Sequence, residues 1–507
     1  MMEKVREVVK KLPTGISGLD LISNGGFSRE RSTLVSGTAG SGKTVLAAQF
    51  LVAGILASGE NGVFVTCEES PADICDNLTS FGWDIRGLER DGKFAFVDAS
   101  PQPGEEVYVM GGYDLGALLA RIEAAIRRIG AKRVSIDSLG AIFNRFDATI
   151  VRNELHRVAA VLKRLGVTAL MTAERVEEYG PIARHGVEEF VADNVVILRN
   201  VLEEEKRRRT IELLKFRGTS HQKGEYPFTI VPGEGIVVIP LSAMQLKQKS
   251  SDVRITSGSR ELDEMCGGGF FRDSVILVSG ATGTGKTLTV THFLAGGAAA
   301  GERCLLFAFE ESREQLFRNA VGWGVDFEAM ERDGRLKVVC DYPEVASLED
   351  HLINVRRTIQ SFKPNRVAVD SLSALERVSS VKGFREFVIG LTSFIKHQEI
   401  AGLFTSNTPT LMGGTSITDT HISTITDSII MLRYVEVYGE MRRGLTVLKM
   451  RGSRHDKDIK EFTIDGHGMH IGRPFRTVSG ILAGNPVQAA PGEAERIAAL
   501  FADQDAT

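Results

Sequence analysis

This chain of 507 residues has few cysteines, no long apolar run and little net charge. Its five cysteines are an odd number without C-x-x-C spacing, which argues against a disulfide framework or a cysteine metal site. Residues 1–11 are charged throughout, unlike a secretory signal, and no apolar stretch reaches the roughly 18 residues of a membrane span. We therefore expect a reduced, cytoplasmic protein with no membrane partner.

The charge balance also bears on nucleic-acid binding. The formal net charge is −4, from 61 basic and 65 acidic residues. This gives no global electrostatic reason to bind a polyanion, so nucleic acid is not an expected partner.

Two P-loops of the form G-x-x-x-x-G-K-[ST] are the strongest positive signal, at residues 37–44 and 280–287. Each follows an apolar strand pattern and precedes a helical one, which is the context this motif requires. Backbone N–H groups of such a loop cradle phosphates, the lysine reaches the outer phosphates, and the hydroxyl binds Mg²⁺. The predicted ATP-binding residues are Gly40, Ser41, Gly42, Lys43 and Thr44, and Thr282, Gly283, Thr284, Gly285, Lys286 and Thr287.

Motifs around the two P-loops recur in the same order, so the chain is a tandem duplication. The recurring pairs are Glu68-Glu69 and Glu310-Glu311, Asp137 and Asp370, and Lys215-Phe216-Arg217 and Lys449-Met450-Arg451. Short apolar strands alternate with helical stretches in each half, which is typical of a mainly parallel sheet with helices on both faces. We predict an α/β fold with domains at 1–240 and 255–485, a linker at 241–254 and a tail at 486–507.

Acidic residues follow predicted strands in both halves, where ligands of open α/β sheets bind. Asp137 and Asp370 end apolar strands, as Walker B aspartates do, and are expected to hold Mg²⁺ directly or through water. The glutamate pairs at 68–69 and 310–311 are the predicted catalytic residues. A carboxylate there can orient water, or accept a proton from a hydroxyl that attacks the γ-phosphate.

A lysine and an arginine, two residues apart, lie late in each half on a predicted strand. They are Lys215 and Arg217, and Lys449 and Arg451. Alternation along a strand puts both cations on one face. Because they are far in sequence from the P-loops, we expect them to act on a neighbouring subunit's nucleotide, as an arginine finger does.

The tandem P-loops, the Glu-Glu pairs and the stretches R-G-T-S-H and G-E-Y-P-F together resemble the KaiC family of circadian-clock ATPases over roughly residues 12–486. The resemblance implies tandem RecA-like P-loop NTPase domains in a double-ring homohexamer, with ATP at subunit boundaries in both rings. It implies slow ATP hydrolysis in the first ring, and serine/threonine autokinase and autophosphatase activity in the second.

Further site residues follow from the same resemblance. Nucleotide contacts are implied at Ser80, Lys215, Phe216, Arg217, Thr219 and His221 in the first half, and at Trp323, Arg443, Lys449, Met450, Arg451 and Ser453 in the second. Contacts to Mg²⁺ are implied at Thr287 and Glu310, and Thr44 is expected to act likewise.

The two halves differ at one position pair that the resemblance makes informative. When residues 193–199 are aligned with 427–433, Ser423 and Thr424 fall opposite Glu189 and Phe190. The second half thus carries hydroxyls where the first carries none. Ser423 and Thr424 match the family's phosphosites, and Thr418 matches a nearby residue linked to phosphate handling.

The resemblance also implies partners. Residues 104–121 keep the stretches G-E-E-V and G-G-Y-D-L near the surface that KaiB uses, so KaiB is an expected partner. The tail after Pro486 diverges where KaiA engages the cyanobacterial protein, so dependence on KaiA is left open, and output signalling partners are compatible with the sequence. Two alternatives stay open: a RecA-like DNA-dependent ATPase, and a signalling ATPase of this type that keeps no daily time.

Overall fold

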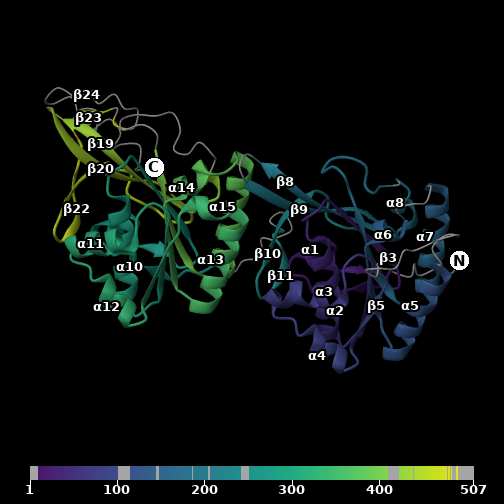
Figure 1. Cartoon of the computed structure of the whole chain (residues 1–507). Coiled ribbons are helices and arrows are strands. Elements are labelled where there is room, and N and C mark those ends of the chain that lie inside the picture. Colours follow the sequence, from purple (N-terminus) through teal and green to yellow (C-terminus); the bar gives the residue numbers. More distant parts are fainter. Residues whose placement is uncertain are drawn as a thin grey trace, which may run out of the picture. The chain divides into compact units, whose positions relative to one another are not determined.

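The computed structural model describes residues 9–100, 115–143, 148–184, 186–203, 206–240, 250–408, 422–437, 439–476, 478–479, 481 and 487–488. The chain divides into two compact units, Met1–Met244 and Gln245–Thr507. Each unit contains one nine-stranded sheet, visible as the arrows of Figure 1. The predicted tandem α/β fold is confirmed.

The sheet of the first unit has the strand order β11-β10-β9-β8-β3-β7-β6-β4-β5. In that order the strands are Gly235–Val238, Glu225–Val231, Lys206–Phe216, Asn194–Glu203, Ser32–Gly37, Thr168–Glu174, Arg133–Asp137, Gly62–Thr66 and Phe94–Asp98. The six strands from β8 to β5 run parallel, whereas β9, β10 and β11 continue the sheet in antiparallel order. The sheet is therefore mainly parallel, with β3 at its centre.

Helices cover both faces of this sheet, because successive side chains of a strand point to opposite faces. Leu34 of β3 packs in the core beneath α5 and α7, and its neighbour Val35 packs in the core beneath α2. Val63 and Phe64 of β4 divide in the same way. The helices are α1 Leu19–Ile22, α2 Lys43–Ser58, α3 Pro71–Leu78, α4 Ile85–Arg90, α5 Leu115–Ile129, α6 Leu139–Phe143, α7 Ala148–Arg164 and α8 Glu188–Val191, with the 3-10 turn η1 at Thr79–Phe81.

The second unit repeats this topology in the order β16-β15-β17-β18-β14-β19-β20-β21-β22. These strands are Leu336–Cys340, Cys304–Ala308, Arg366–Asp370, Ala401–Asn407, Val275–Gly280, Ser428–Val437, Glu440–Met450, Lys460–Asp465 and Gly468–Pro474. The helices are α9 Arg260–Met265, α10 Lys286–Ala299, α11 Arg313–Gly322, α12 Phe327–Arg332, α13 Leu348–Phe362, α14 Leu372–Arg377 and α15 Val381–His397, with 3-10 turns at Pro343–Val345 and Ile422–Thr424.

Short strand pairs complete the described elements. They are β1 Lys11–Leu12 with β2 Phe27–Ser28, β12 Arg254–Ile255 with β13 Phe270–Phe271, and β23 Val478–Ser479 with β24 Val487–Gln488. All five cysteines are free, as the sequence predicts.

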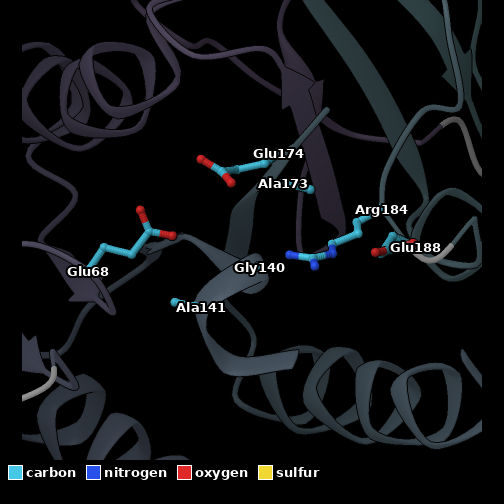
Figure 2. Close-up of a pocket in the computed structure, with 7 residues that line it drawn as sticks. All are labelled: Glu68, Gly140, Ala141, Ala173, Glu174, Arg184 and Glu188. Carbon is cyan, nitrogen blue, oxygen red and sulfur yellow. The ribbon is translucent and has the colours of Figure 1, made fainter. Parts of the chain in front are cut away.

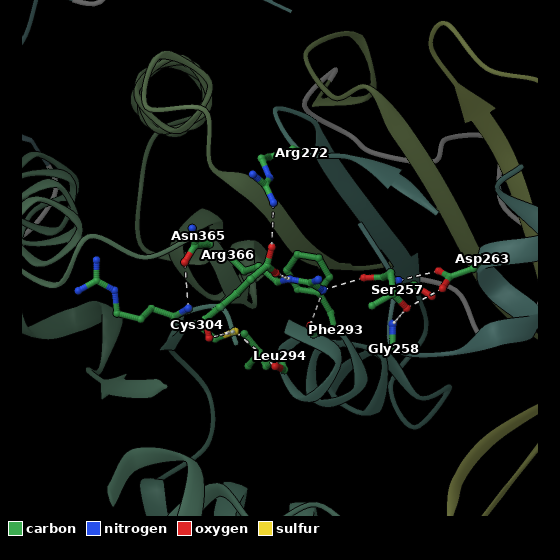
Figure 3. Close-up of polar contacts among 12 residues, drawn as sticks. Ser257, Gly258, Asp263, Arg272, Phe293, Leu294, Cys304, Asn365 and Arg366 are labelled. Carbon is green, nitrogen blue, oxygen red and sulfur yellow. Dashed lines mark hydrogen bonds and ion pairs between the residues drawn. The ribbon is translucent and has the colours of Figure 1, made fainter. Parts of the chain in front are cut away.

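A buried arginine ties the P-loop helix of the second unit to its sheet (Figure 3). Arg366 is 1% exposed and forms an ion pair of 2.5 Å with Glu302. Its guanidinium also donates to the carbonyl oxygens of Thr256 (2.7 Å) and Phe293 (2.9 Å). A Cβ on Gly297 of α10 would lie 2.6 Å from this side chain. The helix therefore has a glycine where the arginine passes beneath it.

The first unit contains the same arrangement. Arg133 forms an ion pair with Glu60 at 2.8 Å and donates to the carbonyl oxygens of Phe50 and Pro13. Gly54 of α2 leaves room for the guanidinium. Removing either arginine would leave backbone carbonyl oxygens of the interior without their partner, which is costly, whereas Glu60 and Glu302 would each keep a second arginine, Arg29 or Arg272.

Candidate functional site

Both P-loops connect the central strand of their sheet to the following helix. In the first unit β3 ends at Gly37 and α2 begins at Lys43. Between them Gly40 and Gly42 have φ angles of 72° and 95°, a region that residues with side chains rarely adopt. The second loop has the same conformation at Gly283 and Gly285. The free N–H groups and dipoles at the beginnings of α2 and α10 favour an anion there.

The P-loop lysines fold over their own loops. The Nζ of Lys43 donates to the carbonyl oxygens of Gly37 (3.0 Å) and Thr38 (2.9 Å), and Lys286 makes the same two contacts. Burial lowers the pKa of both lysines, and nearby carboxylates oppose that shift. Each ammonium group is thus held at the mouth of the anion-binding loop.

Each P-loop threonine meets the aspartate predicted to bind Mg²⁺. The hydroxyl of Thr287 donates to Asp370 at 2.7 Å, and Thr44 bonds Asp137 in the first unit. Burial raises the pKa of both aspartates. Hydroxyl and carboxylate oxygens are hard ligands of the type that Mg²⁺ prefers, so this pair fits such an ion beside a phosphate.

The two glutamates after β4 are not equivalent. Glu68 accepts a hydrogen bond of 2.5 Å from Ser138, directly after β6. Glu69 turns away and accepts from Asn77 of α3 at 2.9 Å. Glu68 therefore lies at the carboxyl ends of the strands, whereas Glu69 is tied to the following helix.

The second unit repeats this division. Glu310 pairs with Arg377 of α14 at 2.9 Å, and Glu311 accepts from Asn319 of α11 at 3.0 Å. Burial and the neighbouring carboxylates raise the pKa of Glu311. The sequence does not distinguish the two glutamates of a pair, and no motif points to Arg377.

A cavity of about 80 Å³ opens in the first unit (Figure 2), and its lining includes Glu174, the strand partner of the first P-loop residue Gly37. Its lining residues come from the carboxyl ends of β4, β6 and β7 and from the segments that follow them: Glu68, Gly140, Ala141, Ala173, Glu174, Arg184 and Glu188. Of these, only Glu68 is among the site residues that the sequence predicts.

Ser80 and Trp323 lie beside the P-loop helices. The carbonyl of Ser80 in η1 accepts from the backbone N–H of Gly233 at 3.0 Å, and Gln49 of α2 donates to the adjacent Glu234 at 3.1 Å. Trp323, at the end of α11, packs against the core that contains α10. Both residues therefore lie on the face of the sheet that the P-loop helix covers.

An arginine from the antiparallel part of each sheet is associated with the P-loop, directly in the first unit and through a tyrosine in the second. Arg443 of β20 stacks 5.7 Å from the ring of Tyr434, whose hydroxyl lies 2.8 Å from the position of a Cβ on Gly283. In the first unit the Nε of Arg209 donates to the carbonyl of Gly40 at 3.4 Å. Sequence analysis missed Arg209, although the duplication aligns it with Arg443.

The Lys-x-Arg pairs lie at the opposite edge of each sheet. Phe216 pairs with Asn194 at the beginning of β8, and Asn194 pairs with Thr33 near the beginning of β3. The P-loop follows the last residue of β3, which a rise of about 3.3 Å per residue puts roughly 13 Å away. The strand ends at Phe216, so Arg217 lies just beyond it rather than on it as predicted. Within one unit, the pair and the P-loop are not brought together.

Both cations of the first unit bind one backbone segment. Lys215 donates to the carbonyl oxygens of Glu189 (2.7 Å) and Ala192 (2.9 Å). Arg217 donates to the carbonyl of Phe190 at 2.9 Å.

The second unit repeats these contacts at the predicted phosphosites. Lys449 donates to the carbonyl oxygens of Ser423 and Thr426, each at 2.7 Å, and Arg451 donates to that of Thr424 at 2.7 Å. The two sets of contacts match residue for residue, so the alignment of Ser423 and Thr424 with the first unit is correct. Ser423 is half-buried and Thr424 is exposed.

The other predicted contacts lie next to these cations. The ring of Phe216 contacts both the Nζ of Lys11 (4.6 Å) and the ring of His221 (5.4 Å). In the second unit the hydroxyl of Ser453 accepts from Arg254 at 2.6 Å. Thr219 is half-buried and Met450 is buried in the corresponding turn and strand.

Some predicted features fall outside the described residues, namely Thr418 and residues 104–114. Within the described part of the chain, no helix is both long and apolar enough to cross a membrane. Among the same residues, no group of three or more His, Cys, Asp or Glu side chains could by itself hold a metal ion.

Comparisons with known proteins agree with this geometry. The family model described as "ATPase: KaiC" matches residues 12–243 and again 255–475. The circadian clock protein KaiC3 of Synechocystis sp. is 68% identical over 502 residues, covering 99% of both chains. The circadian clock oscillator proteins KaiC of Thermosynechococcus vestitus and Synechococcus elongatus are each 58% identical, covering 97% and 95% of this chain and 95% and 93% of theirs. The two family matches and the near full-length identity show that this chain belongs to the KaiC family of ATPases.

Proposed function

We propose that this chain is a clock-type ATPase that also phosphorylates and dephosphorylates itself on Ser423 and Thr424. The family accounts for ATP binding and hydrolysis. The observation that carries the kinase proposal is that Ser423 and Thr424 stand on the backbone segment bound by Lys449 and Arg451, where the first unit has Glu189 and Phe190. The backbone that carries the acceptor hydroxyls is thus held by the cations proposed to meet a neighbour's nucleotide.

The proposed assembly is a double-ring hexamer with ATP at subunit boundaries. Its support is the position of each Lys-x-Arg pair at the sheet edge opposite the P-loop. A head-to-tail contact that closes into a ring brings one subunit's P-loop to the next subunit's cations. The family-derived contacts then divide into a P-loop set with Ser80, Trp323 and Arg443, and a set from the neighbour with Thr219, His221 and Ser453.

We infer that the two units have different activities, because only the second has hydroxyl side chains that can accept a phosphoryl group at the aligned positions. Glu189 and Phe190 cannot accept a phosphoryl group, whereas Ser423 and Thr424 can. We assign steady ATP hydrolysis to the first unit, with Glu68 orienting the attacking water. We assign the autokinase and autophosphatase activities to the second.

In the kinase step, a hydroxyl oxygen of Ser423 or Thr424 forms a bond to the γ-phosphorus. The bond from that phosphorus to the β–γ bridging oxygen breaks, and ADP leaves. The hydroxyl proton passes to Glu310, which Arg377 holds in position. Lys286, and Lys449 of the adjoining subunit, offset the charge that spreads over the phosphoryl oxygens.

Mg²⁺ is the proposed metal cofactor. Thr44 with Asp137, and Thr287 with Asp370 and Glu310, offer the oxygen donors that this ion takes beside nucleotide phosphates. When bound, the ion neutralises phosphate charge and aligns the reacting groups.

We propose KaiB as a partner through residues 104–121, and domain boundaries at 1–240, 241–254, 255–485 and 486–507. Dependence on KaiA is tested by following phosphorylation over time in constant conditions, with and without added KaiA. Candidate output signalling partners are tested in the same way. A rhythm in that time course separates a clock protein from a non-circadian signalling ATPase.

The test of the kinase proposal is phosphopeptide mass spectrometry after incubation with Mg-ATP. Phosphate should appear on Ser423 and Thr424 and disappear in Lys286→Ala. Mixing Lys286→Ala subunits with Ser423→Ala/Thr424→Ala subunits should restore label on the Lys286→Ala chains, because transfer crosses a boundary. Absence of label on both residues in the wild type would leave a tandem ATPase without kinase activity.

A further inference from the structure

Each P-loop begins with a glycine, and the residue that pairs with this glycine on the neighbouring strand differs in charge between the two units. Glu174, the last residue of β7, pairs with Gly37, and Asn407, the last residue of β18, pairs with Gly280. In both units the N–H of the following residue donates to that glycine's carbonyl oxygen, at 3.1 Å and 3.2 Å. Glu174 and Asn407 are therefore structural equivalents, and only the first carries a charge.

Glu174 is the strand partner of Gly37, the first residue of the P-loop, and its carboxylate interacts electrostatically with Lys43, the residue that would reach the outer phosphates. It lines the cavity of the first unit together with Glu68 (Figure 2). Of the carboxylates that oppose the lowering of the Lys43 pKa by burial, Glu174 acts most strongly, ahead of Asp137. For Lys286, the carboxylates in that role are Asp370 and Glu310, which both have counterparts in the first unit.

The loop after Glu174 is fastened to the P-loop. The hydroxyl of Thr38 donates to Glu178 at 2.6 Å, and the same carboxylate accepts from the backbone N–H of Asn200 at 3.1 Å. Ala281 stands at the position of Thr38 in the second unit and cannot form this bond. Glu174 is thus fixed between a paired strand and an anchored loop.

We propose that Glu174 and Asn407 determine how strongly each unit prefers ATP over ADP. The inference rests on the proposal that both P-loops hold ATP. A P-loop lysine reaches the outer phosphates, so a carboxylate beside Lys43 faces charge that ATP carries and ADP lacks. Repulsion weakens ATP relative to ADP in the first unit. Asn407 is uncharged and its amide can donate a hydrogen bond, so the second unit retains ATP better.

This difference suits the two proposed activities. A unit that hydrolyses ATP continuously benefits from a weak preference for the triphosphate, because uniform tight binding of substrate does not raise turnover. A unit that phosphorylates its own chain needs ATP held until the acceptor hydroxyl arrives. The Glu174/Asn407 pair is thereby a specificity determinant that separates the two sites.

The test measures the affinities of the full-length chain for ADP and for the non-hydrolysable analogue AMP-PNP, by displacement of a fluorescent ADP. Lys286→Ala silences the second site, so that the first is read alone. In this background Glu174→Gln should raise the preference for AMP-PNP over ADP at least tenfold. Glu174→Asp should keep the parent ratio, and Glu177→Gln, which changes a nearby acid, should do so as well.

The reciprocal variant completes the test. Asn407→Glu in a Lys43→Ala background should lower the same ratio at the second site. An unchanged ratio in Glu174→Gln, or an equal change in Glu177→Gln, would overturn the proposal. Nucleotide binding that survives in Lys43→Ala/Lys286→Ala would instead refute the assignment of ATP to the P-loops, so the two failures are distinguishable.

Discussion

The Nζ atom of Lys449 lies 2.7 Å from the backbone carbonyl oxygen of Ser423. The same lysine is proposed to meet the nucleotide of a neighbouring subunit. One side chain thus contacts the acceptor segment of its own chain at the sheet edge where a second subunit would supply ATP. Lys215 makes the equivalent bond to Glu189, which has no hydroxyl to phosphorylate. The cation contact therefore does not depend on the presence of an acceptor hydroxyl.

Lys449→Met should reduce phosphorylation of Ser423 and Thr424 at least tenfold. The variant keeps the aliphatic stem but removes two charge-assisted hydrogen bonds, each worth about 1.5–3 kcal/mol. Phosphopeptide mass spectrometry measures this effect, and release of inorganic phosphate measures hydrolysis in the same sample. Lys215→Met is the matched control, with the opposite pattern expected: slower hydrolysis and nearly normal phosphorylation. Equal effects of both variants in both assays would contradict the assignment of the units.

Glu68→Gln should lower steady ATP hydrolysis about 10²-fold or more, the usual contribution of a positioned general base. Glu69→Gln should retain most of the rate, because Glu69 is bound to Asn77 of α3 and turned from the strand ends. Initial rates at saturating ATP distinguish the two. Comparable losses in both single variants would show that the pair acts together.

Gly297→Ala should destabilise the second unit by about 1–3 kcal/mol, the usual range for overpacking. The new Cβ would lie 2.6 Å from Arg366 and 2.7 Å from the sulfur of Cys304. Gly322→Ala is the control, because a Cβ there meets no atom within 4 Å. Urea unfolding followed by Trp323 fluorescence in a Trp83→Phe background reports this unit alone. A Gly297→Ala chain as stable as the control would show that the Arg366 side chain can move away from α10 at little cost.

The stability of the first unit should depend on pH through Lys11. Burial lowers the pKa of Lys11 from 10.5 to about 8. Between these values the unfolded chain binds more protons than the folded one, so stability rises with pH there. The unfolding free energy of wild type relative to Lys11→Met should therefore be flat below pH 8 and increase from pH 8 toward 10.5. Trp83 fluorescence in a Trp323→Phe background measures it, and a flat difference across this range would show that Lys11 titrates normally.

Sequence reasoning reached the fold and the P-loops because local patterns specify them. The strand at 32–37, the helix from Lys43 and the glycine positions all follow from motif and periodicity, and the duplication provides a second copy as a check. The P-loops and the Lys-x-Arg pairs are also recognisable in the sequence as separate motifs. That they lie at opposite ends of the strands can be seen only from the register of β3, β8 and β9.

Contacts made by side chains distant in the sequence could not be predicted. The different partners of Glu68 and Glu69 depend on where Ser138 and Asn77 fall in space. Arg377 reaches Glu310 from a helix 67 residues further along the chain. Glu174 became visible as the counterpart of Asn407 only through its pairing with Gly37. Residue type and spacing along the chain do not specify such tertiary side-chain contacts.

The position of each Lys-x-Arg pair across the sheet from its own P-loop has a consequence for regulation by abundance. Within either unit of a single chain, the Lys-x-Arg pair and the P-loop lie too far apart to meet at one phosphate. With the cations acting across subunit boundaries as proposed, ATP turnover per chain should fall on dilution and rise as chains assemble. The amount of protein in solution thus becomes an input to its specific rate, alongside nucleotide and partners.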